Sequence, residues 1–411
     1  MENLKTLRDK YQEYVEKPIN LNISRGIPSK EQLALSQELL NIDLSDDILT
    51  EDGVDIRNYG GLLGIKEARA LFAELFDISI DEVMVGGNSS LQLMYNVLDH
   101  FTYHQSEPWI NDQKRAFLCP VPGYDRHWDM LDHFGFKTIQ VPLTGAGPDM
   151  DMVEDLVKND PSIKGIFCVP KYSNPTGEVY SEETIDRLAN LEAASNDFKI
   201  LWDNAYIVHH LTHELIEISN ILEKCKRANY PDRVVMFTST SKMTFPGSGM
   251  AAIGTSTKNL DNFMKSFSKQ IISFDKVNQK RLVHFLKDEE TVLRHMAKHG
   301  AILKPKFEYI LDTLDKEFKD NKIITWSRPK GGYFIHLTTK DGCASSIVSK
   351  LKDIGVILTS ANATYPKALN EKDNSIRLAP TFATMDELKK ALEAIVLCIK
   401  MVSLEKEEEN A

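Results

Sequence analysis

The chain has 411 residues, 42% of them hydrophobic and 27% charged, which is enough material for roughly two or three domains with a buried core. The 49 lysines and arginines stand against 60 aspartates and glutamates, so the formal charge is -11. This balance argues against nucleic acid or an anionic membrane as the default partner, because such surfaces need a basic excess. The five cysteines are far apart and form no C-x-x-C pair, which favours a reducing compartment over a disulfide framework or a zinc site.

The chain also lacks the patterns that direct a protein to or through a membrane. Its first residues, MENLKTLRDKYQEY, are charged and have no apolar signal-peptide core, and no run of eighteen apolar residues occurs. We therefore expect a cytoplasmic protein with no membrane partner and no nucleic-acid partner.

Short β-rich runs alternate with helical patterns through the middle of the chain. Helices are expected at 149–160 and 181–195, and strands at 115–120, 137–143, 165–170, 198–202, 233–239 and 251–256. Such alternation is typical of an α/β fold, with a mostly parallel sheet covered by helices on both faces.

The pattern changes after this region. It is almost wholly helical from about 275 to 320 and continues as a strand (332–337), a helix (345–355), a strand (355–359) and a final helix (385–402). This predicts a second, smaller α+β domain that is joined by the N-terminal helix. We expect the large domain at 50–290, and the small domain to be formed by 1–49 together with 291–411.

Four expected strands run into polar or aromatic segments at their carboxyl ends, where open α/β sheets bind ligands. They lead to VPGY with Tyr124, KYSNPTG with Asn174, DNAY with Asp203 and Tyr206, and TSK with Lys242. A lysine beyond a buried strand can lose its proton and attack a carbonyl, although an arbitrary lysine is more often solvated. Asn-Pro-Thr-Gly is first of all a turn. Together the four segments predict one convergent site.

In this order the segments resemble the fold-type I pyridoxal-phosphate enzymes, the aspartate aminotransferase superfamily. The resemblance covers essentially the whole chain, from SRGIP, NYGGLLGIKEAR and GGNSSLQLMYNVL through PGY, NPTG, DNAY and STSK to IRLAP. VPGYDRHWDM, CVPKYSNPTGE and PKGGYF look most like the type Ic aspartate aminotransferases. The resemblance implies transamination between an L-amino acid, with aspartate or glutamate expected, and a 2-oxo acid, with pyridoxal 5′-phosphate as cofactor.

The resemblance also implies roles for the strand-end residues. Lys242 would carry the cofactor on its ε-amine and move a proton. Asp203 would pair with the pyridine nitrogen, and Tyr206 and Asn174 would hydrogen-bond the ring oxygen O3′. Tyr124 would stack on the ring face.

Further residues would hold the phosphate group. Asn88, Ser89 and Ser90 would begin a helix whose free N–H groups point at it, and Ser239 and Ser241 would donate hydroxyls. In the family, the tyrosine that matches Tyr59 reaches the phosphate of the neighbouring subunit, which implies a homodimer.

The amino-acid substrate would meet two residues besides Asn174. Arg377 would clamp its α-carboxylate bidentately, and Gly26 would let the N-terminal segment approach it. No metal is expected.

The sequence departs from the family pattern at one position, and it does not assign a residue to the side chain of the substrate. Most relatives carry an arginine eight residues after the lysine, but here that position is Met250. No residue is assigned to a side-chain carboxylate of the substrate, and Arg25, Arg126, Lys171 and Lys276 are open candidates.

Rival interpretations fit less of the chain. Gly247-x-Gly249-x-x-Ala252 resembles a dinucleotide fingerprint but follows its strand at a distance and precedes another strand. His209, His210 and His213 lack a metal-binding pattern. Ser239-x-x-Lys242 matches a serine acyl-enzyme motif, which leaves Asp203 unexplained. A C–S lyase, a decarboxylase or racemase on the same fold, and a non-catalytic sensor domain stay as alternatives to the transaminase.

Overall fold

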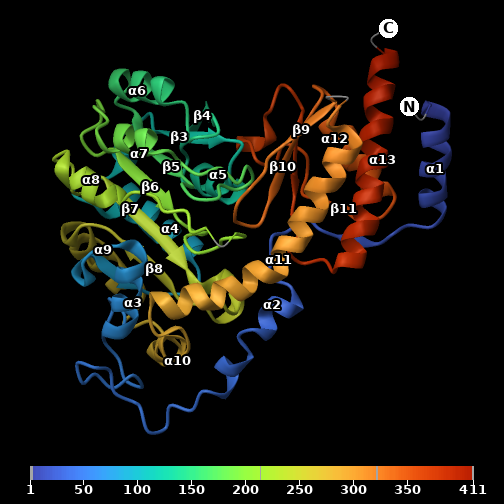
Figure 1. The fold of residues 1–411 in the computed structure, drawn as a ribbon. Coiled ribbons are helices and arrows are strands. Elements are labelled where there is room, and N and C mark those ends of the chain that lie inside the picture. Colours follow the sequence, from blue (N-terminus) through green and yellow to red (C-terminus); the bar gives the residue numbers. More distant parts are fainter. Residues whose placement is uncertain (1–2, 213, 321–322, 410–411) are drawn as a thin grey trace.

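The larger of the two main sheets has seven strands in the order β2-β8-β7-β6-β5-β3-β4 (Figure 1). The computed structural model describes residues 3–212, 214–320 and 323–409. The sheet is mostly parallel, and only β8 runs antiparallel to both of its neighbours. Its strands are β2 (Val83–Val85), β3 (Ala116–Val121), β4 (Lys137–Pro142), β5 (Ile163–Cys168), β6 (Lys199–Asp203), β7 (Val234–Ser239) and β8 (Ala251–Gly254).

Helices cover both faces of this sheet. On β6, Ile200 and Trp202 belong to one hydrophobic cluster, whereas Leu201 between them belongs to another, as the two-residue period of a strand requires. The first cluster includes side chains of α3 (Lys66–Phe76), α6 (Met150–Asn159), α7 (Glu182–Ala189), α8 (Ile221–Arg227) and α10 (Lys276–Leu286). The second includes side chains of α4 (Ser90–Asp99), α5 (Asp125–His133) and α9 (Thr257–Gln270).

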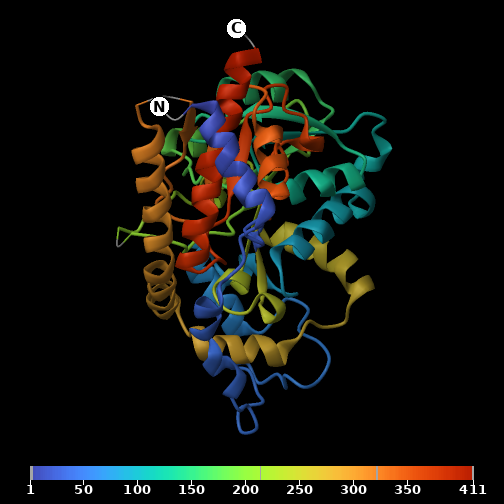
Figure 2. The same ribbon diagram turned by 90° about the vertical axis from the view of Figure 1, so that its right-hand side faces the viewer.

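A smaller unit is built on a three-stranded antiparallel sheet in the order β12-β10-β9. Its strands are β9 (Ile324–Trp326), β10 (Ile335–Thr339) and β12 (Ser375–Leu378), and its helices are α12 (Ala344–Asp353) and α13 (Met385–Glu409). The N-terminal helix α1 (Leu4–Glu16) lies along α13 (Figure 2). The short strand β1 (Leu21–Asn22) pairs in parallel with β11 (Val356–Ile357).

The 30-residue helix α11 (Glu289–Phe318) runs from the large sheet to the small one (Figure 1). Val292 and Met296 near its start pack in the large core, whereas Leu303 and Phe307 belong to the core of the smaller unit. The remaining short helices are α2 (Lys30–Ala34), η1 (Gln37–Asn41), η2 (Ile80–Glu82), η3 (His100–His104), η4 (Trp109–Asn111), η5 (Thr240–Lys242), η6 (Pro246–Ser248) and η7 (Pro366–Ala368).

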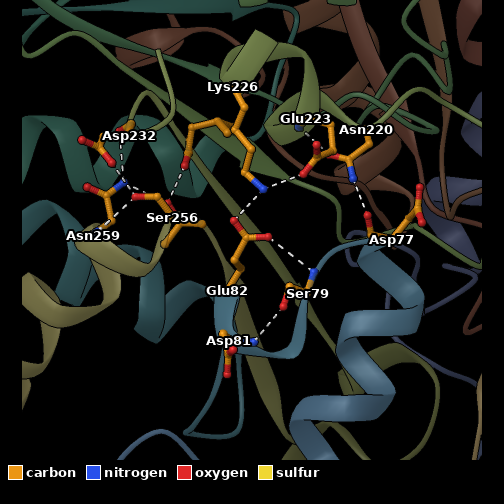
Figure 3. Close-up of polar contacts among 12 residues, drawn as sticks. Asp77, Ser79, Asp81, Glu82, Asn220, Glu223, Lys226, Asp232, Ser256 and Asn259 are labelled. Atoms are coloured by element: carbon orange, nitrogen blue, oxygen red, sulfur yellow. Dashed lines mark hydrogen bonds and ion pairs between the residues drawn. The ribbon is translucent and has the colours of Figure 1, made fainter. Parts of the chain in front are cut away.

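A polar network fixes the edge of the large sheet at β2 (Figure 3). Lys226 on α8 makes ion pairs with Glu82 at 2.6 Å and Glu223 at 2.5 Å, and Asn220 at the start of α8 donates to the carbonyl of Asp77. These contacts tie α8 to the segment between α3 and β2.

The predicted α/β class is confirmed, and the six expected strands of the large sheet all form. Two predicted bounds are wrong. The helix expected at 181–195 ends at Ala189, and the strand expected at 332–337 forms at Ile335–Thr339 because Gly332 takes a positive φ of 77° just before it. Among the described residues no helix is long and apolar enough to cross a membrane.

Candidate active site

The four strand ends singled out in the sequence meet at one cavity of about 490 Å³. Tyr124, Asn174, Asp203 and Lys242 line it and follow β3, β5, β6 and β7, which are consecutive neighbours in the sheet. Arg377 on β12 of the smaller unit closes it from the other side. The convergent site predicted at the carboxyl edge of the sheet is therefore present, and it lies between the two units.

Asp203 is the last residue of β6 and is only 3% exposed. Its Oδ2 lies 3.0 Å from Nε2 of His127, whose ring stacks on Phe167 with centroids 4.2 Å apart. Its Oδ1 is buried and has no hydrogen-bond partner in the described part of the chain. A buried carboxylate oxygen without a donor is costly, so this position calls for a proton-bearing group from a ligand.

Lys242 ends the short helix η5 and reaches into the cavity, where its Nζ lies 4.9 Å from the centroid of the Tyr206 ring. Burial lowers the pKa of Lys242, and the charge of Asp203 opposes that shift only in part. Burial raises the pKa of Tyr206 well above its usual value, so its hydroxyl stays protonated. The cavity thus holds an amine shifted toward its neutral form next to a phenol that can donate.

A buried polar network supports the backbone of Lys242. The hydroxyl of Tyr333 donates to the Lys242 carbonyl at 3.2 Å, and Nε2 of Gln32 lies 3.0 Å from that hydroxyl and 3.1 Å from Nδ1 of His299. His299 in turn contacts His295, whose Nε2 lies 2.8 Å from the Met243 carbonyl. Because Gln32 is on α2 and both histidines are on α11, the lysine turn is fixed by elements outside the sheet.

Arg377 is 8% exposed and has a mixed set of partners. Its Nη1 donates to Oδ1 of Asn174 at 3.2 Å, and its Nη2 donates to Oγ1 of Thr359 at 3.0 Å. Nη1 also lies 3.5 Å from Oδ1 of Asp125, and Nε is buried without a partner among the described residues. The guanidinium therefore keeps an unsatisfied donor in a cavity that can admit a carboxylate.

Gly26 brings the N-terminal segment against the ring of Phe334. A Cβ at Gly26 would stand 2.5 Å from Cζ of that ring, so no larger residue fits without a shift. The same ring carries the Arg377 guanidinium, 4.7 Å from its centroid. Both residues line the cavity, so Gly26 is where the sequence predicts it, beside the arginine.

The residues expected at a phosphate group form a second cluster beside the lysine. Ser89 caps α4 and Ser90 begins it, as predicted. Ser239 donates to the hydroxyl of Ser241 at 3.1 Å, and Ser241 donates to the carbonyl of Asn88 at 2.9 Å. The start of α4 and the lysine turn are thus in direct contact.

Met250 does not replace the arginine that most relatives carry there. Its side chain is fully buried in the core of the large sheet, and its backbone N–H donates to Oγ1 of Thr240 at 3.0 Å. Tyr59, in contrast, is 76% exposed and is not part of the cavity lining.

The structure separates the four open candidates for a side-chain carboxylate. Arg25 and Arg126 line the cavity. Lys171 and Lys276 do not line it: Nζ of Lys171 donates to the Ile207 carbonyl at 2.7 Å in a different cavity, and Nζ of Lys276 donates to the carbonyls of Asn58 and Gly60. Both lysines are buried by these backbone contacts, which sequence spacing does not reveal.

The histidine-rich segment is not a metal site in the described residues. His209 is buried between aromatic rings and His210 lies 2.6 Å from the Tyr172 hydroxyl, whereas His213 falls outside the described residues. No group of three or more His, Cys, Asp and Glu side chains in the described ranges is placed to hold a metal ion.

Sequence reasoning missed His127, Tyr333 and Thr359. His127 follows Tyr124 by three residues, and their rings meet edge to face at 5.0 Å. That spacing at a helix start is a usable signal. Tyr333 and Thr359 lie more than 90 residues from Lys242 in the sequence and offer no local signal.

A half-buried lysine beyond a central strand, a strand-end aspartate and an arginine from a second unit meet in a cavity between the two sheets of an α/β fold. A sequence model of the family described as aspartate amino-transferase matches residues 1–410. An aspartate aminotransferase of Corynebacterium glutamicum is 39% identical over 403 residues, which cover 97% of this chain and 93% of that protein. A Mycolicibacterium smegmatis protein named for aminotransferase activity is 40% identical over 401 residues, which cover 96% and 94%.

The fold agrees with these matches. The crystal structure of an aspartate transaminase from Corynebacterium glutamicum has a TM-score of 0.95 to this chain at 38% identity, covering 98% of this chain and 96% of that chain. The chain belongs to the aspartate aminotransferase family. It is an aminotransferase, an enzyme that exchanges amino groups between an amino acid and a 2-oxo acid.

Proposed function

We propose that the enzyme uses pyridoxal 5′-phosphate to move an amino group between aspartate or glutamate and a 2-oxo acid. The observation that carries this proposal is the unsatisfied Oδ1 of Asp203 in the same cavity as the amine of Lys242. The donor set fits the cofactor, because a protonated pyridine nitrogen would satisfy that oxygen and the lysine could bond its aldehyde. When bound, the cofactor supplies an aldehyde that accepts amino groups and a ring that withdraws electrons.

The chain's own residues would do the rest. Asp203, held by His127, would turn its unpartnered Oδ1 toward the ring nitrogen. Lys242, shifted toward its neutral form, can take a proton from the substrate Cα and return it. Tyr206 and Asn174 donate to the ring oxygen, Tyr124 packs on the ring face, and burial raises the pKa of Tyr124 to about 12.

The substrate's α-carboxylate would bind Arg377. Nη1 and Nη2 already contact Asn174 and Thr359, and Nε is buried without a partner among the described residues. A carboxylate that binds the guanidinium bidentately would supply an acceptor for Nε. Gly26 keeps the N-terminal segment close to the bound substrate. This fixes the Cα–H bond relative to Lys242.

The phosphate group would be held mainly by neutral donors. These are the free N–H groups at the start of α4 from Asn88 to Ser90, and the hydroxyls of Ser239 and Ser241. Tyr59 is exposed and would supply a further hydroxyl to the partner subunit of a homodimer; Lys276 donates to the carbonyls of the residues on either side of it.

Two further expectations stay proposals. The division into a large domain at 50–290 and a small one at 1–49 and 291–411 is supported by the pairing of β1 with β11 and by the packing of α1 on α13. A cytoplasmic location is supported by five free cysteines, all buried.

The test is a half-reaction screen of the purified holoenzyme. Each amino acid is mixed with enzyme in the absence of acceptor, and the loss of the cofactor band above about 400 nm is followed. We expect aspartate and glutamate to bleach the band and the matching 2-oxo acid to restore it. Lys242→Ala should lose both the band and turnover. Release of ammonia, carbon dioxide or a racemised amino acid instead would refute transamination.

A further inference from the structure

The active-site cavity contains one more arginine that faces it without an acidic partner. Arg25 lines the cavity and is exposed, and no ion pair or hydrogen bond of its side chain is present in the described part of the chain. Each of the other two lining arginines contacts an acidic side chain. Arg377 contacts Asp125 at 3.5 Å, and Arg126 contacts Asp129 at 3.5 Å.

The backbone that carries Arg25 is fixed to Arg377 through one residue. The hydroxyl of Thr359 donates to the carbonyl of Ser24 and accepts from Nη2 of Arg377. A second tie follows Arg25, because Gly26 packs against the Phe334 ring on which the Arg377 guanidinium lies. The residues before and after Arg25 are therefore each connected to Arg377, Ser24 through Thr359 and Gly26 through Phe334.

The segment is also fixed on its outer side. The Ile23 N–H donates to the Ile357 carbonyl at 2.9 Å, which extends the pairing of β1 with β11, and Oγ1 of Thr381 donates to the Ile27 carbonyl at 2.8 Å. The backbone of Arg25 is thus ordered on both sides, while its side chain remains available. Its guanidinium is always charged and can donate to a carboxylate bidentately.

We infer that Arg25 binds the side-chain carboxylate of a dicarboxylic substrate while Arg377 holds the α-carboxylate. This inference rests on the proposed function and names its specificity residue. Two arginines on one cavity match the two carboxylates of aspartate or glutamate, and neither carboxylate is then left desolvated without a partner. Arg126 is the weaker candidate, because its guanidinium already lies 3.5 Å from the Asp129 carboxylate.

The experiment compares amino acids with and without a second carboxylate. Half-reaction kcat/KM is measured for aspartate, glutamate and alanine with the wild-type holoenzyme, Arg25→Gln, Arg25→Lys and Arg126→Gln. Arg294→Gln on the exposed face of α11 is the matched control, since Arg294 pairs with Glu290 far from the cavity. Inhibition by succinate and by propionate reports binding without turnover.

We expect Arg25→Gln to lower kcat/KM for aspartate and glutamate about 10- to 100-fold, mainly through KM, and to change alanine less than about threefold. Succinate inhibition should weaken in parallel while propionate inhibition does not. Arg25→Lys should recover part of the loss because it keeps the charge without the fork.

Three results would overturn the inference. These are equal losses for aspartate and alanine in Arg25→Gln, a selective loss in Arg126→Gln alone, and a wild-type enzyme that prefers alanine to both dicarboxylates. The last result would leave transamination standing. A wild-type enzyme that reacts with no amino acid would refute the proposed function itself and the inference with it.

Discussion

Lys242 and Tyr206 lie in the same cavity, and burial there shifts their pKa values in opposite directions. Burial lowers the pKa of the lysine and raises that of the tyrosine, because in both cases it disfavours the charged form. The neutral amine is the form that attacks a carbonyl, and the neutral phenol is the form that donates a hydrogen bond. Both shifts therefore favour the neutral form of the side chain.

Glu178, which is not one of the reacting groups, predicts how the stability of the fold depends on pH. Its Oε1 accepts from the Gly147 N–H at 2.9 Å, but burial raises its pKa from 4.5 to about 7. The folded state then binds more protons than the unfolded state between these values. The stability that this group contributes is present below pH 4.5 and is lost as the pH rises through about 7.

Glu178→Gln should remove this dependence. We expect the variant to gain stability relative to the wild type between pH 5 and 8, on the order of 1–3 kcal/mol, because the amide never ionises. Urea unfolding at four pH values measures the difference, with Glu290→Gln on the surface of α11 as the control. Parallel curves for Glu178→Gln and the wild type would contradict the prediction.

For single residues, the sequence predicts those that lie at the ends of strands. It does not predict residues whose role depends on contacts between distant segments of the chain. Asp203, Asn174 and Lys242 could be placed because each lies at or just beyond the end of a short β-rich run. The contact of His127 with Asp203 joins residues 76 positions apart, and only the packing of α5 on the sheet creates it. The burial of Met250 likewise depends on the core around it.

The segment from Ser24 to Ile27 can lie where it does only because Gly26 packs directly against the Phe334 ring. Gly26→Ala would place a methyl group 2.5 Å from the Phe334 ring, and that ring carries Arg377. The ring must move, and the guanidinium with it. We expect KM for the amino donor to rise about tenfold with a small loss in Tm, because a displaced carboxylate contact is worth about 1.4 kcal/mol or more.

Steady-state kinetics measures the change in KM of Gly26→Ala, and thermal unfolding measures the change in Tm. Gly247→Ala is a suitable control, because nothing lies within 4 Å of a Cβ at that position. Unchanged KM in Gly26→Ala, or a loss of stability large enough to explain the kinetics, would remove the proposed role of Gly26.

Most elements that the sequence predicted are long, although the four-residue strand β8 was expected and the 14-residue helix α9 was not. The five- and six-residue strands β3 to β7 and the helices α10, α11 and α13 all lie where the pattern indicates. Strands β2, β9 and β12 have three or four residues and were not expected, because so few positions cannot establish a period. Arg377 was found from a motif, whereas the strand β12 that contains it was not expected.

For the whole molecule, the cavity depends on both sheets. Lys242 and Asp203 come from the large sheet, Arg377 comes from the small one, and α11 belongs to both cores. The network from His295 to Tyr333 links α11 to the carbonyl of Lys242. A change in how the two units sit would therefore alter the distance between the amine and the arginine, which no local sequence pattern encodes.

The homodimer proposal makes a prediction about mixed subunits. Lys242→Ala removes the reacting amine, and Tyr59→Ala removes the phenol whose hydroxyl we assign to the partner's phosphate group. In a mixed dimer one site carries both changes, whereas the other combines an intact Lys242 with an intact Tyr59 from the opposite subunit. That second site is wild type in composition.

We therefore expect mixing to restore function. Tyr59→Ala alone should bind the cofactor about tenfold more weakly, because a hydrogen bond to a charged group is worth roughly 1.5–3 kcal/mol. Lys242→Ala alone should be inactive. After co-expression and purification by two tags, the mixed dimer should regain wild-type cofactor affinity and turnover in half of its sites, as measured by equilibrium dialysis and kcat per dimer. If each site used its own Tyr59, the intact Lys242 would stay paired with the alanine, and the mixed dimer would show the weakened affinity of Tyr59→Ala.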